Sequence, residues 1–147
     1  MDSNKTVILS GARTPIGKLG GALSSIPAPE LGSIAIKAAI DKAKLDATQI
    51  DYTIMGNVLS AGLGQAPARQ AAISAGISNN KSALTVNKVC ASGIMSIILA
   101  TLMIRAGDAD IVVAGGMENM SLSPHLLPNS RTGKRAGQWE MLDSMIH

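Results

Sequence analysis

The stretch Asn87-Lys88-Val89-Cys90-Ala91-Ser92-Gly93 joins a short apolar run to a long one, and this junction decides the fold. Residues 83–86 upstream are apolar and β-branched, which predicts a short strand. Residues 94–105 downstream are apolar on nearly all sides, which predicts a helix buried in a core. Cys90, the only cysteine, therefore lies at a strand-to-helix corner, with Ser92 placed to cap the helix.

Cys90 at such a corner has the setting of a nucleophile. A thiol at a helix N-terminus faces unpaired N–H groups and the positive end of the helix dipole, and both favour the thiolate. The same N–H groups could hold an oxyanion that forms on an acyl carbon bound to the sulfur. The alternative is an inert, buried side chain, because free cysteines are among the most buried residues. The corner predicts nucleophilic acyl transfer, and the alternative stays open at this point.

The composition of the 147 residues is that of an apolar globular chain. Hydrophobic residues make up 46% and charged residues 16%, with a net charge of +3, which does not fit a disordered segment. The positive charges are scattered and aromatic residues are almost absent, so no nucleic-acid partner is expected. The apolar content also indicates that part of the surface is buried against a partner.

The cysteine count and the N-terminus bear on the location of the protein. A single cysteine excludes an internal disulfide and fits a reducing compartment. The polar N-terminus shows no signal peptide, and the apolar run at residues 94–104 is expected to be too short to span a membrane. We therefore expect a soluble, cytoplasmic protein without a membrane partner.

Strand-like and helix-like segments alternate along the chain. Short apolar runs predict buried strands at residues 6–9, 52–55, 83–86 and 111–114. Helical spacing predicts helices at residues 29–44, 68–75 and 94–105. The short links favour parallel pairing, which gives an α/β fold in βαβαβαβ order, with helices on both faces of a mostly parallel sheet.

Residues that follow parallel strands should meet at one rim, because the carboxyl ends of the strands face the ligand crevice. Cys90 follows one predicted strand and residues 115–121 follow another. The candidate pocket residues beside Cys90 are Ser92, Glu118, Asn119 and Met120. For Glu118 and Asn119, a hydrogen-bonded turn after a buried strand is an equal alternative.

Two glycine-containing stretches depart from the phosphate-binding motifs that they resemble. Gly17-Lys18 does not end a phosphate loop, because position 12 is alanine and position 19 is leucine. Residues 62–67 begin like a dinucleotide fingerprint, but proline stands at the sixth position. A structural turn is the better prediction for the second stretch.

The pattern changes at residue 122. Prolines and glycines interrupt any period, and Arg131, Lys134 and Arg135 cluster. A loop over the surface is one interpretation, and an arm that binds a partner or an anion is the other.

Six short motifs run in order across the chain and together resemble the thiolase family, of the acetyl-CoA acetyltransferase type. They are Arg13-Thr14-Pro15-Ile16-Gly17, Gly56-Asn57-Val58-Leu59, Gly64-Gln65-x-Pro67-Ala68-Arg69-Gln70, Asn87-Lys88-Val89-Cys90-x-Ser92-Gly93, Gly107-Asp108-Ala109-Asp110 and Gly115-Gly116-Met117-Glu118-Asn119-Met120-Ser121. Ala91 stands where many thiolases have glycine, and both residues are small.

The resemblance implies a fold and a mechanism. The fold would be the N-terminal half of a thiolase, with residues 1–121 in the core domain and residues 122–147 beginning the loop domain or oligomerisation arm. Cys90 would take the acyl group of an acyl-CoA as a thioester, with its own backbone N–H as an oxyanion donor. A second acetyl-CoA would then attack in a reversible Claisen condensation that gives acetoacetyl-CoA. CoA enters as a substrate, and no metal or other cofactor is expected. The resemblance also implies that the protein forms a homodimer or a homotetramer.

Three further thiolase motifs, N-E-A-F, G-H-P and C-x-G, are missing from this sequence. The histidines are His125 and His147, and neither lies in a G-H-P motif. We therefore expect the chain to be inactive alone. Two alternatives stay open: a non-catalytic, thiolase-like assembly module, and another condensing enzyme of this fold, such as a ketoacyl synthase. Arg69 is expected to be a structural ion-pair partner rather than a CoA contact.

Overall fold

The computed structural model describes residues 5–146, so the predictions that concern residues 1–4 and His147 lie outside the described residues. Three parallel strands form one sheet in the order β2-β1-β3. They are β1 (Tyr52–Gly56), β2 (Ser82–Val86) and β3 (Val112–Gly116). Gly56 is in register with Val86 and with Gly116, so the three carboxyl ends lie at one edge of the sheet.

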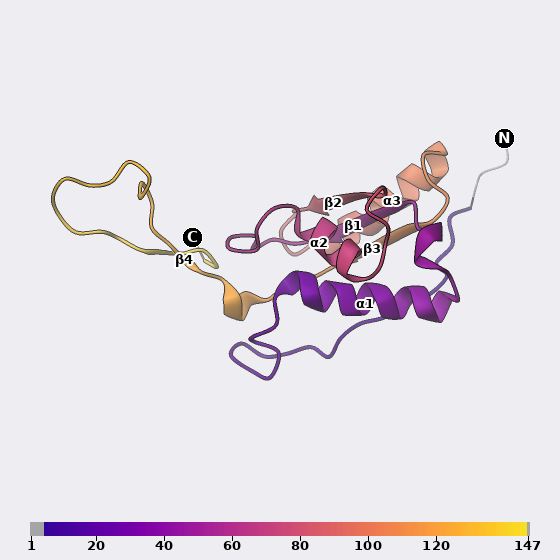
Figure 1. Ribbon diagram of the computed structural model, residues 1–147, viewed down its shortest axis with the longest axis horizontal. Helices are drawn as coiled ribbons and strands as arrows, with labels where there is room; N and C mark the ends of the chain where they lie inside the picture. Colours follow the sequence, from indigo (N-terminus) through magenta and orange to yellow (C-terminus); the bar gives the residue numbers. More distant parts are fainter. Residues whose placement is uncertain (1–4, 147) are drawn as a thin grey trace.

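Helices cover both faces of this sheet, which confirms the predicted α/β fold. α1 (Ala28–Ala43) and α2 (Pro67–Ser74) share a buried cluster with Met55 of β1, and α1 runs along the lower side of the sheet in Figure 1. α3 (Ser92–Ala106) packs on β1 and β3 from the opposite face. The chain reverses its direction across the sheet at β2, and a constant handedness of crossing then places α2 and α3 on opposite faces.

The helix ends carry the signals that the sequence contains. A proline stands in the first turn of α1 and of α2, where its missing N–H costs no hydrogen bond. α1 ends at Lys44 and α3 ends at Gly107, both in the left-handed conformation that closes a helix. A short 3-10 helix, η1 (Ala47–Gln49), leads into β1 and is capped by Asp46.

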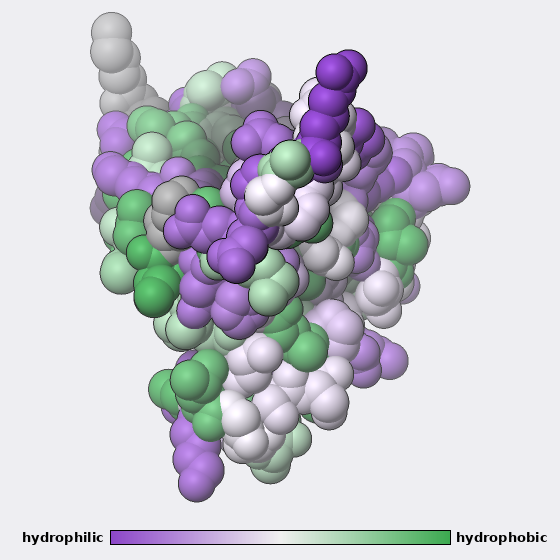
Figure 2. Space-filling model, turned by 90° about the vertical axis from the view of Figure 1, so that its left-hand side faces the viewer, coloured by the Kyte–Doolittle hydropathy of each residue, from purple (hydrophilic) through white to green (hydrophobic). Residues whose placement is uncertain are grey.

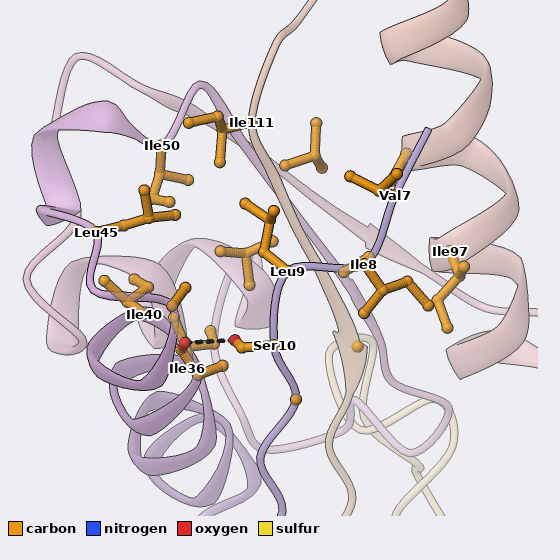
Figure 3. Close-up of a pocket in the computed structure, with 18 of the residues that line it drawn as sticks. Val7, Ile8, Leu9, Ser10, Ile36, Ile40, Leu45, Ile50, Ile97 and Ile111 are labelled. Atoms are coloured by element: carbon orange, nitrogen blue, oxygen red, sulfur yellow. Dashed lines mark hydrogen bonds between the residues drawn. The ribbon is translucent and has the colours of Figure 1, made fainter. Parts of the chain in front are cut away.

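The prediction of a buried strand at residues 6–9 is wrong. Residues 5–10 have no regular secondary structure, and Val7, Ile8 and Leu9 are exposed. Ser10 Oγ donates a hydrogen bond to Ala39 O of α1 (2.5 Å), as Figure 3 shows. A cavity of about 630 Å³ is lined both by this segment and by β3. An apolar run becomes a strand only where a neighbouring strand offers its N–H and C=O groups. Here the cavity lies between residues 5–10 and β3, so they do not pair.

α3 is buried along one stripe rather than on all sides, so the prediction of a fully buried helix is also wrong. Its buried residues, Ser92, Ser96 and Ala100, are small and spaced four apart, so they share one face. The large apolar residues of α3 that are exposed are Ile94, Ile97, Ile98 and Leu102. Small side chains allow the helix backbone to approach the sheet closely, and only that narrow stripe is covered.

The segment Val89–Ala106 has the length and the hydropathy of a membrane-spanning helix. The prediction that the apolar run at residues 94–104 is too short to span a membrane is wrong by that criterion, which also includes residues 89–93. One such helix is a weak indication, because the core helix of a soluble protein meets the same criterion. α3 itself has 15 residues and so extends about 22 Å, which is less than the roughly 30 Å hydrocarbon core of a bilayer.

The chain after η2 (Met120–Leu122) forms an arm. β4 (His125–Leu126) pairs antiparallel with β5 (Leu142–Asp143), and the loop between them extends away from the sheet in Figure 1. This loop therefore does not lie over the surface of the core, whereas Met145 at the base of the arm lines a cavity together with residues 13–19. Figure 2 views the molecule from the side on which the arm lies and shows hydrophilic and hydrophobic residues interspersed. The domain boundary after residue 121 stays a prediction.

Candidate functional site

Cys90 is exposed in the turn that joins β2 to α3. Two side chains fix this turn. Asn87 Oδ1 accepts a hydrogen bond from the Val89 N–H (3.0 Å). Ser92 Oγ accepts one from the Lys88 N–H (2.8 Å) and donates one to Val89 O (2.6 Å). The exposure of Cys90 does not fit the alternative of a buried, inert side chain.

The turn holds Val89 in an unusual backbone conformation. Val89 has a φ of +49°, in the left-handed region that β-branched residues rarely adopt. Such a conformation costs roughly 1–3 kcal/mol and persists only where the surroundings enforce it. Here the bonds to Asn87 and Ser92 hold both the N–H and the C=O of Val89. The strain therefore lies directly before Cys90.

The N–H groups of the turn are used unequally. The N–H groups of Ala91 and Ser92 donate to Lys88 O and Val89 O, whereas within residues 5–146 the Cys90 N–H has no acceptor. That N–H is a donor of the kind that an oxyanion on a Cys90-bound acyl carbon requires. The prediction that Ser92 caps α3 is wrong, because Ser92 is the first helical residue and its hydroxyl is used within the turn.

The strand ends bring the Cys90 turn and residues 115–121 to one rim, as the parallel order predicts. A Cβ atom added to Gly56 would lie 2.6 Å from the Ser92 carbonyl carbon and 2.8 Å from Gly93 N. A Cβ added to Gly116 would lie 3.5 Å from Gly93 Cα. The ends of β1 and β3 therefore contact the start of α3 backbone to backbone, with no side chain between them.

Glu118 and Asn119 both bind loops near the rim, which supports the turn interpretation for these residues. The Glu118 carboxylate accepts hydrogen bonds from the loop after β1, from Asn57 Nδ2 (2.8 Å), Val58 N (2.9 Å) and Leu59 N (3.2 Å). Asn119 Nδ2 lies within hydrogen-bonding distance of three carbonyl oxygens of the loop before α1, those of Leu23 (3.2 Å), Ser24 (3.1 Å) and Ile26 (2.7 Å).

The structure brings together three of the four candidate pocket residues. Glu118, Asn119 and Met120 line a cavity of about 390 Å³ together with residues 13–19. Cys90 and Ser92 line neither this cavity nor the larger one in Figure 3. The larger cavity is lined mostly by apolar residues. Within residues 5–146, no three His, Cys, Asp or Glu side chains gather as a metal site would require.

Asn57 is the residue of this rim that sequence reasoning missed as a functional residue. It is 1% exposed and makes hydrogen bonds to Val86, the last residue of β2, to Met117 after β3, and to its own loop. The available signal was a polar residue directly after an apolar strand, which also describes many ordinary turns.

Arg69 has the expected structural role but not as an ion-pair partner. Its guanidinium donates to the backbone carbonyls of Asn79 and Lys81, just before β2. The ion pair among residues 5–146 joins Lys81 to Asp51 (3.2 Å). The structural turn predicted at residues 62–67 is confirmed, because Gln70 Nε2 closes it through hydrogen bonds to two of its carbonyls.

Comparison with known proteins gives one consistent result. The family model described as "Thiolase, N-terminal domain" matches residues 6–147. An acetyl-CoA acetyltransferase of Cupriavidus necator is 56% identical over 140 residues, which is 95% of this chain and 36% of the relative. A probable acetyl-CoA acetyltransferase of Mycobacterium tuberculosis is 56% identical over 142 residues, 97% of this chain and 36% of the relative. An acetyl-CoA acetyltransferase of Pseudomonas aeruginosa is 51% identical over 140 residues, with 95% and 36% covered. The chain thus spans about a third of the length of these curated relatives.

Proposed function

The chain belongs to the thiolase family, and on that premise we propose that Cys90 accepts the acetyl group of acetyl-CoA in the reversible condensation that yields acetoacetyl-CoA. One observation carries the proposal. An exposed cysteine, with its own N–H free among the described residues, lies in a strained turn between a parallel strand and a helix. The names of the relatives support acetyl-CoA as the substrate.

In the first step the Cys90 sulfur attacks the carbonyl carbon of acetyl-CoA. A C–S bond forms, and the carbonyl electron pair moves to oxygen, where the Cys90 N–H can donate to the oxyanion. Collapse of this intermediate breaks the bond to CoA, which leaves as a thiolate. The acetyl group remains on Cys90 as a thioester, the form in which covalent catalysis stores it.

In the second step the enolate of another acetyl-CoA attacks the acetyl carbon. A C–C bond forms and the Cys90 thiolate leaves, which releases acetoacetyl-CoA and restores the residue. Formation of the enolate needs a base, and the G-H-P and C-x-G motifs that supply acid-base groups in thiolases are missing from this sequence. We therefore propose that this chain supports the first step and does not turn over alone.

The test is covalent labelling of the chain by acetyl-CoA. We expect the intact mass to rise by one acetyl group, and peptide mapping to place that group on Cys90 as a thioester that hydroxylamine removes. Cys90→Ser is the matched control and should remain unlabelled under the same conditions. Equal labelling of the Cys90→Ser chain, or none of the wild type, would remove the basis of the proposal.

Exposed apolar surface favours a second candidate, an assembly role in a homodimer or homotetramer. Ile94, Ile98 and Leu102 are spaced four apart along α3 and form an exposed apolar face, and contiguous exposed apolar patches often mark contact surfaces. Sedimentation of the wild type and of Cys90→Ser, with and without acetyl-CoA, separates the candidates. Self-association that is unchanged by acetyl-CoA and by Cys90→Ser supports the assembly role. A chain that stays monomeric at all concentrations contradicts it.

The division of the chain and its location belong to the same proposal. We propose a core at residues 1–121 and an arm at residues 122–147, in a soluble cytoplasmic protein. Limited proteolysis should then cut first within the exposed loop between β4 and β5. Cleavage that begins inside the core would contradict this division.

A further inference from the structure

Asn57, the residue after β1, ties the carboxyl ends of all three strands together. Its N–H donates to Val86 O at the end of β2 (3.1 Å). Its Nδ2 donates to Met117 O after β3 (3.1 Å) and to Glu118 Oε1 (2.8 Å), and its Oδ1 accepts from Ser60 Oγ (2.7 Å). The residue is 1% exposed, and both side-chain polar atoms have partners, so the position of this amide is fixed.

Glu118 completes the tie by accepting three hydrogen bonds. Asn57 Nδ2 and the Leu59 N–H reach Oε1, and the Val58 N–H reaches Oε2. All three partners are donors that cannot accept. Both terminal atoms of residue 118 must therefore be acceptors, and at this length a carboxylate is the side chain that meets the requirement.

Two routes connect the loop after β1 to the turn that carries Cys90. In the first, Asn87 Nδ2 donates to Val58 O (3.4 Å), and Asn87 Oδ1 accepts from the N–H of Val89 (3.0 Å), the residue before Cys90. The second route is steric, because the backbone of Gly56 abuts the first residues of α3. A displacement of the loop therefore reaches both sides of the Cys90 turn.

We propose that Glu118 is a positioning residue for Cys90: through Asn57 and the loop after β1, its carboxylate holds the acyl-accepting turn in place. This inference rests on the proposed function, because the group being positioned is the sulfur that accepts the acetyl group. Glu118 itself forms no bond to the substrate in this account.

Glu118→Gln tests the proposal with almost no change in volume. It replaces one acceptor with an NH₂ group that faces donors, so the loop after β1 must move. A small misplacement of reacting groups can lower a rate by as much as about 100-fold. We expect the rate constant for acetylation of Cys90 to fall about tenfold, with complete final labelling and an unchanged half-saturating concentration of acetyl-CoA.

The measurement is a time course of intact mass at several acetyl-CoA concentrations. Glu140→Gln is the matched control, because Glu140 is exposed on the arm and its substitution removes the same charge. A merely structural role would lower the labelled fraction at an unchanged rate constant, and that result would overturn the proposal. A wild-type rate constant in Glu118→Gln would overturn it as well.

Asn87→Asp provides a second test that does not disturb the buried tie. Asn87 is exposed, and the aspartate keeps the acceptor for the Val89 N–H but loses the donor to Val58 O. We expect slower acetylation of Cys90 in a chain with wild-type stability, and an unchanged rate would contradict the first route.

Alkylation of Cys90 by iodoacetamide separates failure of the inference from failure of the proposed function. If acetyl-CoA does not label the wild type, the proposed function fails, but the alkylation rate still reports the position of the sulfur. A several-fold difference between Glu118→Gln and wild type supports positioning, and equal rates overturn it. If the wild type is acetylated and Glu118→Gln is acetylated equally fast, only the positioning role fails.

Discussion

The two ends of the sheet are held together by different chemistry. At the amino end, the Asp51 carboxylate accepts hydrogen bonds from the N–H groups of Asp110 and Ile111, just before β3 (3.0 Å each). It also accepts one from Lys81 Nζ, just before β2 (3.2 Å). At the carboxyl end the corresponding tie is the amide of Asn57. The Asp51 side chain is 34% exposed, whereas Asn57 is 1% exposed.

The contrast shows that the stability of the fold depends more on the buried tie than on the exposed one. In both ties a polar residue beside the central strand, β1, reaches both neighbouring strands. Water can replace the partners of an exposed carboxylate, but it cannot reach those of a buried amide, which are left unsatisfied when the amide is removed. The carboxyl end, where Cys90 lies, should therefore lose more stability when its contacts are broken.

The largest effect is expected from Gly56→Ala, which pushes a methyl group into the carboxyl end. The new Cβ would lie 2.6 Å from the Ser92 carbonyl carbon and 2.8 Å from Gly93 N, and these backbone atoms of α3 cannot move aside as a flexible side chain could. We expect the free energy of unfolding in urea to fall by about 3 kcal/mol. Gly93→Ala is the control, because a Cβ there meets no atom within 4 Å, and it should be neutral or slightly stabilising. Wild-type stability of Gly56→Ala would show that β1 does not abut α3.

Asn57→Ala should have the next largest effect, because it removes the buried tie itself. Met117 O loses its donor, and Glu118 Oε1 keeps only the Leu59 N–H of its two donors; an unsatisfied buried group is costly. We expect a loss of about 2–3 kcal/mol in urea unfolding. Asn80→Ala, an exposed asparagine in the turn before β2, should change stability by less than about 0.5 kcal/mol. Equal effects of the two substitutions would remove the distinction between buried and exposed ties.

Asp51→Asn should cost less, on the order of 1 kcal/mol at neutral pH, because water screens this carboxylate. Hydrogen bonds from Ile111 and Asp110, and the nearby Lys81, hold the pKa of Asp51 below its ordinary value of 3.8. A lowered folded pKa means that the stabilisation is present above 3.8 and is lost as the pH falls through the folded pKa.

Urea titrations at neutral pH and well below pH 3.8 test this dependence. The stability difference between wild type and Asp51→Asn should shrink at the lower pH. Asp108→Asn is the control, because Asp108 is exposed near the amino end and its substitution removes the same charge. A difference that stays constant with pH would mean that the tie at the amino end does not depend on ionised Asp51.

The smallest effect is expected from Val89→Gly, which relieves the backbone strain in the turn before Cys90. Glycine adopts a φ of +49° without a steric penalty, and its greater freedom in the unfolded chain offsets part of the gain. We expect stabilisation by about 0.5 kcal/mol in urea unfolding, which is smaller than the effect of Asp51→Asn. Val89→Ala keeps a Cβ in the left-handed region and should gain less. Destabilisation by Val89→Gly would show that Val89 is not strained.

The helices and the three paired strands could be predicted because each contains its own local signals. Prolines begin α1 and α2, Gly107 ends α3, and β1 to β3 are bounded by turn residues. Residues 6–9 contain the same apolar pattern as β3 and form no strand, because pairing depends on a neighbour that the pattern does not describe.

The corner at Cys90 was predictable, whereas the roles of its neighbours were not. A serine before a helix can cap the helix or close the preceding turn. The left-handed turn at Val89 decides between these roles by bringing the Lys88 N–H to Ser92 Oγ. Glu118 and Asn57 are 61 residues apart, and no local pattern indicates that two such residues will meet.

The sequence by itself determined the order of the elements, the family and the place of Cys90 between a strand and a helix, because these depend on residues close together in the chain. Only the tertiary structure decided which face of α3 is covered, that residues 6–9 stay unpaired, and that Asn57 and Glu118 meet behind the Cys90 turn. These features arise from contacts between distant segments, whose geometry is set when the sheet and its helices pack together.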